Sequence, residues 1–348
     1  MTKRILIIIM LIAMMGFLSA EEEFIRIEQW NHGDQELYVG IDGPLIDKDG
    51  HMVAYFGKLG ARLITPDNVT AFAPLGQGPS DAYLVCGICQ YNDDIAFVEL
   101  YHKIKIFTKK GNTYAWKATN WLKRDYYPQI IRDVIFFKDK WFLAGDNTIS
   151  EKGEKFEKSL IKVFDSAGKP IKVLIERVYN GKNAFHQMDH YIVHNNKDRV
   201  FFLAENELKV YVICPDKLEI LKEVNLEIPA FYKKMPDDFY VFKLYENDSR
   251  DFYRDYQKWK TSYSRIVRVK QEGNYLAIQI RTFGEKQKKF AVLFYNVDTF
   301  KLEKIFSTDD LFLATRDGKY YFYANGNPGY DEGTDNCIIN IYAFKEKK

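Results

Sequence analysis

The chain has 348 residues, with 50 Lys and Arg against 48 Asp and Glu, so its formal net charge is +2. This near balance excludes the broad basic excess expected of a nucleic-acid-binding protein, and it argues against an acidic disordered tail. Apolar residues make up 47% of the chain and aromatic residues 16%, mostly Tyr and Phe, while Pro occurs only 10 times. This composition supports a packed core and favours strands over helices.

The first 20 residues have the order of an export signal. Two basic residues precede an unbroken apolar stretch over 5–18, and Ala20 leads into three glutamates. The apolar stretch is shorter than the roughly 20 residues that a membrane-spanning helix needs. We therefore predict cleavage near Ala20 and a secreted or periplasmic mature chain, 21–348, without stable membrane insertion. The alternative is that the segment is kept as a membrane anchor.

The sequence repeats one hairpin pattern six times. Each copy is an apolar strand, a tight polar turn and a second apolar or aromatic strand, as in a β-hairpin. The turns are centred at Gly50, Asp94, Asp139, Asp198, Gly273 and Gly318. Consecutive centres are 44, 45, 59, 75 and 45 residues apart, and the two long intervals contain insertions around 150–158 and 229–262.

A second hairpin follows the first in most units, so one unit is four antiparallel strands in about 45 residues, a propeller blade. The last unit has only three strands, ending with 338–344, and the chain has a spare strand over 24–30. We predict that the spare strand completes the last blade and closes the ring. The expected fold is an all-β, six-bladed β-propeller forming a single domain over 21–348. The insertion at about 229–263, between blades four and five, has aromatic residues at helical spacing that predict one short helix near 249–263.

One segment resembles a known family. The residues GQGPSDAY at 76–83 resemble the GQGPGE(F/Y) segment between blades of bacterial six-bladed β-propeller proteins related to NHL repeats. The run IKVFD at 161–165 resembles the third strand and turn of those blades. Ser80 and Asp81 stand where the family has Gly and Glu. The resemblance implies the propeller fold and export, with the segment as a structural turn, and it implies no particular activity.

Candidate binding residues come from the positions where the first strand of each blade begins, because these strands line the channel of a propeller. Eight residues before the turn centres stand Asp42, Cys86, Ile131, His190, Arg265 and Asp310. Ionisable neighbours extend this set. We predict that a polar ring binds a small or acidic ligand at the channel mouth, bordered by the insertion. The ring consists of Asp42, Arg132, Asp189, His190, Arg265 and Asp310. A wet channel also tolerates such residues without any ligand.

The Cys and His residues give weaker signals. Cys86 and Cys89 form a CxxC in a strand context, which we interpret as two half-buried thiols or a local disulfide. His186, His190 and His194 recur every four residues, but on a strand they lie roughly 13 Å apart, at ~3.3 Å per residue, too far to share a metal. A cross-channel site between Cys86 and His190 is the remaining alternative, and we predict no metal and no cofactor.

Together these observations predict an exported, monomeric, non-catalytic binding protein. Its channel or face would bind a small-molecule ligand or another envelope protein, and no nucleic acid. One alternative is a propeller enzyme, a lyase or hydrolase, that uses His190 with Arg132 or Arg265 and the ring carboxylates. Another is a purely structural interaction module. The lack of a compact catalytic motif discriminates weakly, because propeller enzymes scatter their residues among blades.

Overall fold

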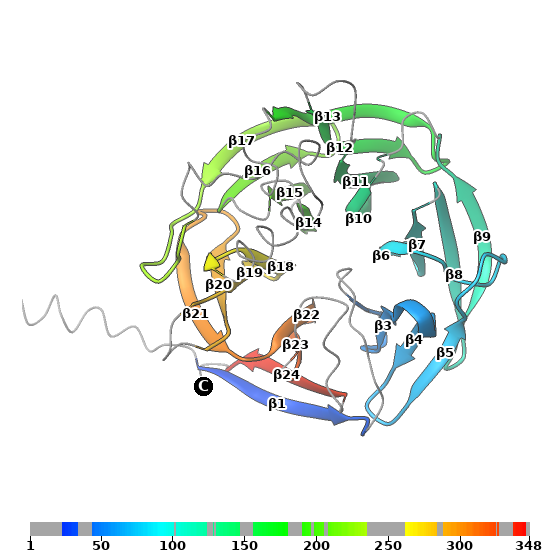
Figure 1. Cartoon of the computed structure of the whole chain (residues 1–348), viewed down its shortest axis with the longest axis horizontal. Coiled ribbons are helices and arrows are strands. Elements are labelled where there is room, and N and C mark those ends of the chain that lie inside the picture. Colours follow the sequence, from blue (N-terminus) through cyan, green and yellow to red (C-terminus); the bar gives the residue numbers. More distant parts are fainter. Residues whose placement is uncertain are drawn as a thin grey trace, which may run out of the picture.

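Six sheets surround a central axis in the computed structural model (Figure 1). Each sheet has four antiparallel strands, which confirms the predicted six-bladed propeller. The structure describes residues 23–33, 44–100, 102–123, 128, 130–146, 156–179, 190–195, 198–204, 208–234, 262–283, 288–324, 326 and 337–345.

Blades 1 to 5 each use four consecutive strands. Blade 1 contains β2 (Leu45–Ile46), β3 (Met52–Tyr55), β4 (Ala61–Ile64) and β5 (Val69–Ala73), with a short 3₁₀ turn η1 (Gly57–Leu59) between β3 and β4. Blade 2 contains β6 (Val85–Tyr91), β7 (Asp94–Glu99), β8 (Lys103–Lys110) and β9 (Thr113–Trp121). Blade 3 contains β10 (Ile130–Phe137), β11 (Lys140–Asp146), β12 (Phe156–Asp165) and β13 (Pro170–Tyr179). Blade 4 contains β14 (His190–Asn195), β15 (Arg199–Ala204), β16 (Lys209–Cys214) and β17 (Glu219–Asn225). Blade 5 contains β18 (Ile266–Glu272), β19 (Tyr275–Arg281), β20 (Phe290–Asn296) and β21 (Leu302–Thr308).

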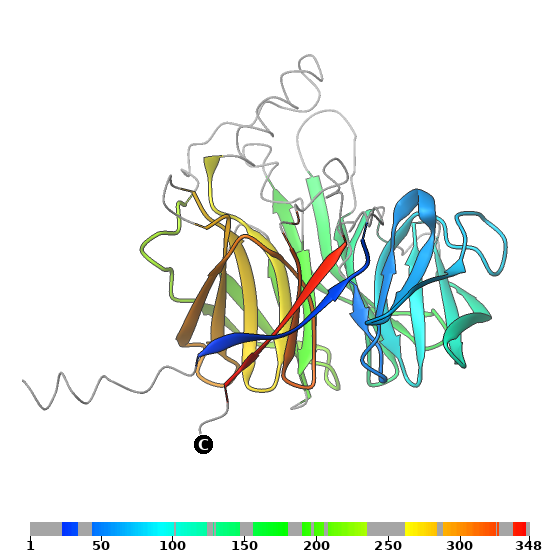
Figure 2. The same cartoon turned by 90° about the horizontal axis from the view of Figure 1, so that it is seen from below.

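Blade 6 is built from both ends of the chain. It contains β22 (Leu311–Arg316), β23 (Lys319–Tyr323) and β24 (Ile338–Phe344), and β1 (Phe24–Asn31) pairs antiparallel with β24 as its fourth strand. Figure 2 shows β1 in blue beside β24 in red. The ring of Phe24 packs against the rings of Phe294 and Phe306 in blade 5, at centroid distances of 5.4 and 4.7 Å. The predicted ring closure is therefore confirmed, and β1 also ties blade 6 to blade 5.

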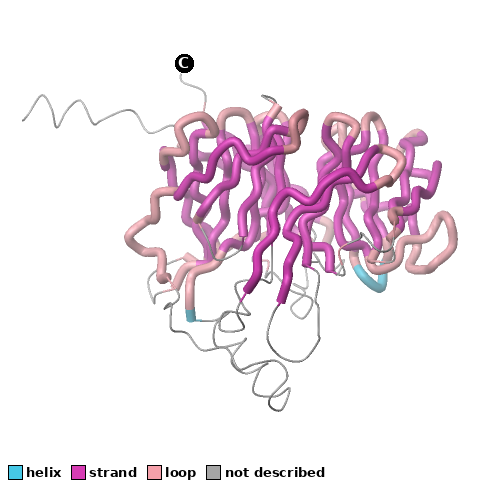
Figure 3. Tube along the Cα trace, turned by 90° about the horizontal axis from the view of Figure 1, so that it is seen from above, coloured by secondary structure: helices cyan, strands magenta, loops and turns pink. Residues whose placement is uncertain are grey.

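The hairpin turns between first and second strands lie together at one end of the molecule (Figure 3). Lys138 and Asp139 both have positive φ, as a two-residue type I′ turn requires, and Asp317 and Gly318 repeat this geometry. Gly273 has positive φ at the first position of its turn. Most turn centres identified in the sequence are thus residues whose backbone reverses the chain, whereas in blade 2 the positive φ is at Asn92 and the centre Asp94 is already the first residue of β7. We call this end the turn face and the opposite end, where the first strands begin, the strand-start face.

The core lies between neighbouring blades, because alternate residues of a strand point to opposite faces of its sheet. In blade 2, Phe97 and Phe107 pack toward blade 1, whereas Val98 and Ile106 pack toward blade 3. Every blade therefore has two buried faces, which explains the near-continuous apolar runs of its inner strands.

Two predictions fall on residues that the structure does not describe. The export signal at 1–20 lies outside the described residues, and so does most of the insertion at 229–263, including nearly all of its predicted helix near 249–263. Within the described ranges, no helix is long and apolar enough to cross a membrane.

Candidate functional site

The structure describes the side chains of three of the six predicted ring residues, Arg132, Arg265 and Asp310. Asp42 and Asp189 lie outside the described residues. His190 is the first residue of β14, and only its backbone is described. The ring as a whole therefore stays a prediction.

Asp310 lies between β21 and β22, and its carboxylate points across its own blade. Its Oδ2 accepts hydrogen bonds from Asn340 Nδ2 at 2.8 Å and from Tyr342 Oη at 3.5 Å, both on β24. Asn340 Oδ1 in turn accepts a hydrogen bond from Gln29 Nε2 of β1 at 2.7 Å. Asp310 thus belongs to a hydrogen-bond network that fastens the closing strand.

The two arginines occupy different levels of the channel strands. Arg265 precedes β18 and is only 4% exposed, although we expected it at a solvated channel mouth. Arg132 is half-buried at a β-bulge of β10, where the register shifts between Ile131 and Asp133. The corresponding bulges in blades 2 and 5 fall at Cys86 and Val267. Arg132, rather than Ile131, is therefore level with Cys86, because turns of different length make the turn centre an inexact reference.

The segment GQGPSDAY forms a tight loop between blades 1 and 2. Asp81 Oδ2 accepts a hydrogen bond from the backbone N–H of Gly78 at 3.0 Å. A Cβ atom at Gly76 would lie 2.3 Å from that oxygen, and one at Gly78 would lie 2.8 Å from it. Only glycine fits at these two positions without displacing the carboxylate.

A buried ion pair of blade 2, Lys105 and Glu99, supports this loop through hydrogen bonds. Lys105 Nζ donates to the carbonyl oxygens of Gly78 at 2.8 Å and Asp81 at 2.7 Å, and it lies 3.0 Å from Glu99 Oε1. The side chains of Lys105 and Glu99 are 2% and 1% exposed. Glu99 Oε1 also accepts the N–H of Tyr83 at 3.0 Å. The segment is therefore a structural turn in this chain, anchored at both its middle and its end.

Exposed leucines border the loop at the strand-start face. Leu75 and Leu84 flank it, and Leu59 ends η1; all three are exposed. A Cβ on Gly60 would lie 2.9 Å from the backbone N of Leu75, so η1 and the loop are in contact. Leu84 has a φ of 47°, a left-handed conformation that is uncommon for a bulky residue. We call Leu59, Leu75 and Leu84 the leucine rim.

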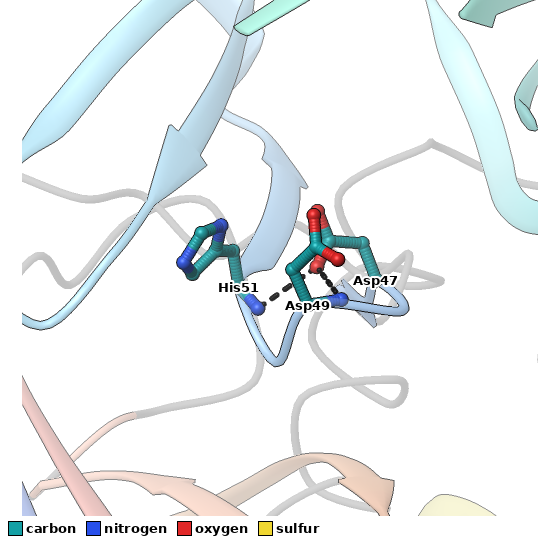
Figure 4. Close-up of side chains that lie close together, drawn as sticks. All are labelled: Asp47, Asp49 and His51. Carbon is teal, nitrogen blue, oxygen red and sulfur yellow. Dashed lines mark hydrogen bonds between the residues drawn. The ribbon is translucent and has the colours of Figure 1, made fainter. Parts of the chain in front are cut away.

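A cluster that the sequence reasoning missed lies in the β2–β3 turn (Figure 4). Asp47, Asp49 and His51 bring their ligand atoms within 4.8 Å of one another. Asp47 Oδ1 accepts the backbone N–H groups of Asp49 and His51, both at 2.9 Å, as in an Asx turn. Carboxylates and imidazole are donors that bind divalent cations. The Asp-x-Asp-x-His spacing was the available signal in the sequence.

A lysine from blade 2 occupies this cluster. Lys109 Nζ donates to Asp47 Oδ2 at 2.7 Å, forms an ion pair with Asp49 and lies 3.4 Å from His51 Nδ1. Tyr114 Oη donates to Asp47 Oδ2 at 2.9 Å. The ammonium group supplies the positive charge that a metal would supply, so the cluster is a clamp between blades 1 and 2 and gives no support for a metal site.

The charges of this clamp are stabilised in the folded state. Burial alone would raise the pKa of Asp47, but hydrogen bonds from Lys109, the His51 N–H and Tyr114 outweigh it and lower the pKa below 3.8. Burial would lower the pKa of Lys109, but its bonds to Asp47 and Asp49 raise the pKa above 10.5. Both groups are therefore ionised at neutral pH.

All four cysteines are free thiols, so Cys86 and Cys89 do not form the local disulfide that was one of two interpretations. Cys86 is half-buried and Cys89 is buried. Burial raises the pKa of the Cys89 thiol far above its usual value, and it raises the pKa of Cys337 to about 12. These two buried thiols are structural groups, because the thiolate is the reactive form.

Comparison with known proteins supports the fold alone. No family model matches the chain, and no curated protein is detectably similar to it in sequence. A crystal structure of a Bacteroides fragilis protein assigned as exported has a TM-score of 0.59 and 12% sequence identity, covering 93% of this chain and 95% of that one. A Thermus thermophilus structure assigned as an oxidoreductase (glucose dehydrogenase) has a TM-score of 0.48 and 10% identity, with 92% and 99% coverage. The WD40 β-propeller domain of Doa1 has a TM-score of 0.44 and 11% identity, with 93% and 98% coverage. The last two scores are too low to carry an argument.

Proposed function

We propose that the chain is an exported, non-catalytic binding protein that docks another envelope protein on the strand-start face of blades 1 and 2. The observation that carries this proposal is the leucine rim, which surrounds a loop held by the buried Lys105–Glu99 pair. Exposed apolar side chains on a fixed scaffold are typical of protein-interaction surfaces. The left-handed backbone of Leu84 adds to this, because strained residues cluster at functional sites.

The predicted channel ring supports a ligand less well than the rim supports a partner. The carboxylate of Asp310 is engaged with Asn340 and Tyr342, and Arg265 is buried. A small-ligand site therefore depends on Asp42, Asp189 and the side chain of His190, which remain predictions. No described group favours the enzyme alternative over binding.

Export and family membership are parts of the same proposal. The charged, apolar and small-residue order of positions 1–20 supports export, as does the assignment of the Bacteroides fragilis protein as exported. The tight loop at 76–83 supports a relation to the NHL-related propellers, because it has the structural role that the resemblance implies.

Photo-cross-linking from the leucine rim tests the proposal. A photoreactive residue is placed at position 75 or 84 in the cells that produce the protein, and a control at the exposed Lys48 on the turn face. We expect a discrete adduct with one envelope protein from positions 75 and 84 only. The complex is then reconstituted from purified proteins, where Leu75→Asp or Leu84→Asp should weaken binding at least tenfold and Lys48→Asp should not. Equal labelling from all positions, or unchanged affinity, would contradict the proposal.

A further inference from the structure

Strand β9 is the outer edge of blade 2. Its end at Trp121 meets the β12–β13 turn of blade 3, where a Cβ on Gly168 would lie 2.8 Å from the carbonyl oxygen of Trp121, but the strand lacks the charged residues and the shortness that usually protect sheet edges. The strand order β6-β7-β8-β9 leaves one side of β9 without a strand partner, as in every blade. Proteins protect such edges with charged side chains or by keeping the strand short. β5 has only five residues, and β1, β13, β17 and β21 each carry both acidic and basic residues. β9 has nine residues, one lysine and no acid.

Two exposed tryptophans lie on one face of this edge. Trp116 pairs with Phe107 and Trp121 pairs with Lys103, while Thr119 pairs with Lys105. These β8 partners alternate, so all three β9 residues lie on the face that Phe107 turns toward blade 1. The register shift between Ile106 and Phe107 keeps Trp116 and Thr119 on the same face. We call Trp116, Thr119 and Trp121 the aromatic shelf.

The aromatic shelf is ordered by its own contacts and lies beside the loop of the leucine rim. Trp116 Nε1 donates to Thr119 Oγ1 at 3.1 Å, and Lys103 Nζ lies 5.0 Å from the ring centroid of Trp121. Lys105, opposite Thr119, holds the loop at 76–83. The shelf thus extends the proposed docking face onto the outer surface of blade 2.

Tryptophan side chains are largely buried, on average, in folded proteins. Trp116 is 40% exposed and Trp121 is 62% exposed. Tryptophan is the residue type most enriched among the energetic centres of protein interfaces. Their partners on β8 are four residues apart, so the two rings are roughly 13 Å apart along the strand at ~3.3 Å per residue. This spacing fits residues i and i+4 of an extended segment lying alongside β9.

Every charged residue of β8 and β9 is a lysine. On β8 and β9, Lys105, Lys109 and Lys117 form ion pairs with carboxylates of the propeller. Among the described residues, no carboxylate forms an ion pair with Lys103, Lys110 or Lys123. A second copy of the chain would bring these lysines together, whereas an acidic segment complements them.

We propose that β9 is a strand-addition site, at which an extended acidic segment of the partner protein adds as a fifth strand of blade 2. Its backbone would pair with the open edge of β9, and alternate apolar side chains would pack on the aromatic shelf. This inference rests on the proposed function and specifies how the partner is bound.

Synthetic peptides test the mode of binding. The probe is a fluorescent ten-residue peptide in which Ile and Glu alternate, and its affinity for the mature chain is measured by fluorescence anisotropy. One control peptide has Lys in place of Glu, and another carries N-methyl groups on one backbone edge. The variant is Trp116→Ala with Trp121→Ala, and the matched control is Ile220→Ala with Leu221→Ala on the outer strand of blade 4. Circular dichroism melts verify that each variant folds.

We expect the acidic peptide to bind, and the tryptophan variant to bind it at least tenfold more weakly than the matched control does. The lysine peptide and the N-methylated peptide should each lose at least tenfold in affinity. Absence of binding, or equal affinity of any control peptide, would overturn the inference. If the mature chain forms a dimer that the tryptophan variant dissociates, a second copy is the occupant and the inference is wrong. If alginate, an acidic polysaccharide, binds and its binding is lost in the tryptophan variant, a polysaccharide is the occupant and the inference is also wrong. Cross-links from positions 75 and 84 that persist while the peptides fail would leave the proposed function intact.

Discussion

Replacing Lys105 with methionine should destabilise the propeller and loosen the loop at 76–83. The ammonium group has three partners, at 2.7, 2.8 and 3.0 Å, and methionine supplies none of them while keeping most of the volume. The change removes the positive charge beside the buried carboxylate of Glu99, which keeps its hydrogen bond from the N–H of Tyr83 at 3.0 Å. Removing one partner of a buried pair costs about 3–5 kcal/mol. For a domain of this size, with ~2.1 cal/mol/K of unfolding entropy per residue, the melting temperature should fall by about 4–7 °C.

Calorimetry of the variant checks this value, and Lys110→Met is the matched control. Lys110 is exposed at the end of the same strand, so its loss should change stability by no more than ~0.5 kcal/mol. The double variant with Glu99→Gln should be less destabilised than the sum of the single variants, because the two side chains interact directly. Proteolysis of Lys105→Met should also begin within the loop at 76–83. A melting temperature within 1 °C of the unchanged protein would refute the reasoning.

Three further outcomes follow from the structure. Deleting residues 21–30 should lower stability by several kcal/mol in denaturant titration, because it exposes the edge of β24 and its aromatic packing; unchanged stability would contradict the closure by β1. The pKa of Asp47 is lowered and that of Lys109 is raised, so their pair stabilises the fold fully between the ordinary pKa values of 3.8 and 10.5. This stabilisation is lost as the pH falls through the lowered pKa of Asp47 or rises through the raised pKa of Lys109. Asp47→Asn should therefore reduce thermal stability at pH 7, and the difference from the unchanged protein should shrink as the pH falls through the lowered pKa of Asp47; a difference that stays constant as the pH falls would count against this account. Thiol titration should leave Cys89 and Cys337 unmodified until the protein unfolds, and rapid labelling of either in the native protein would contradict their burial.

The fold was predictable because its determinants are local. Alternating apolar residues mark each strand, and residues that tolerate positive φ, such as Asp139 and Gly318, mark each turn. Ring closure followed from counting strands in the last unit. What the repeat could not provide was the register, since bulges at Cys86, Arg132 and Val267 shift positions by one residue.

The candidate sites were harder to predict because they depend on contacts distant in the sequence. The acidic turn at Asp47 was visible as a pattern, but its partner Lys109 is 62 residues away in another blade. Arg265 carries a charge that favours a solvated channel mouth, yet packing buries it. Trp116 and Trp121 are five residues apart and share a face only because of the register shift between them, which hydrophobic periodicity does not reveal.

The pairing of β1 with β24 also determines when the ring can be completed. The side chains of Arg26 and Asn340 meet across 314 residues of chain. Closing a loop of that length costs about 1.7 kcal/mol more conformational entropy than closing one of roughly 45 residues, the size of a blade. Blades 1 to 5 can each form from neighbouring residues, whereas blade 6 needs both ends of the chain and should assemble last and slowly. Until then, the apolar faces that Phe24 and Trp30 cover remain open, so the folding intermediate with an open ring is the state most prone to aggregation.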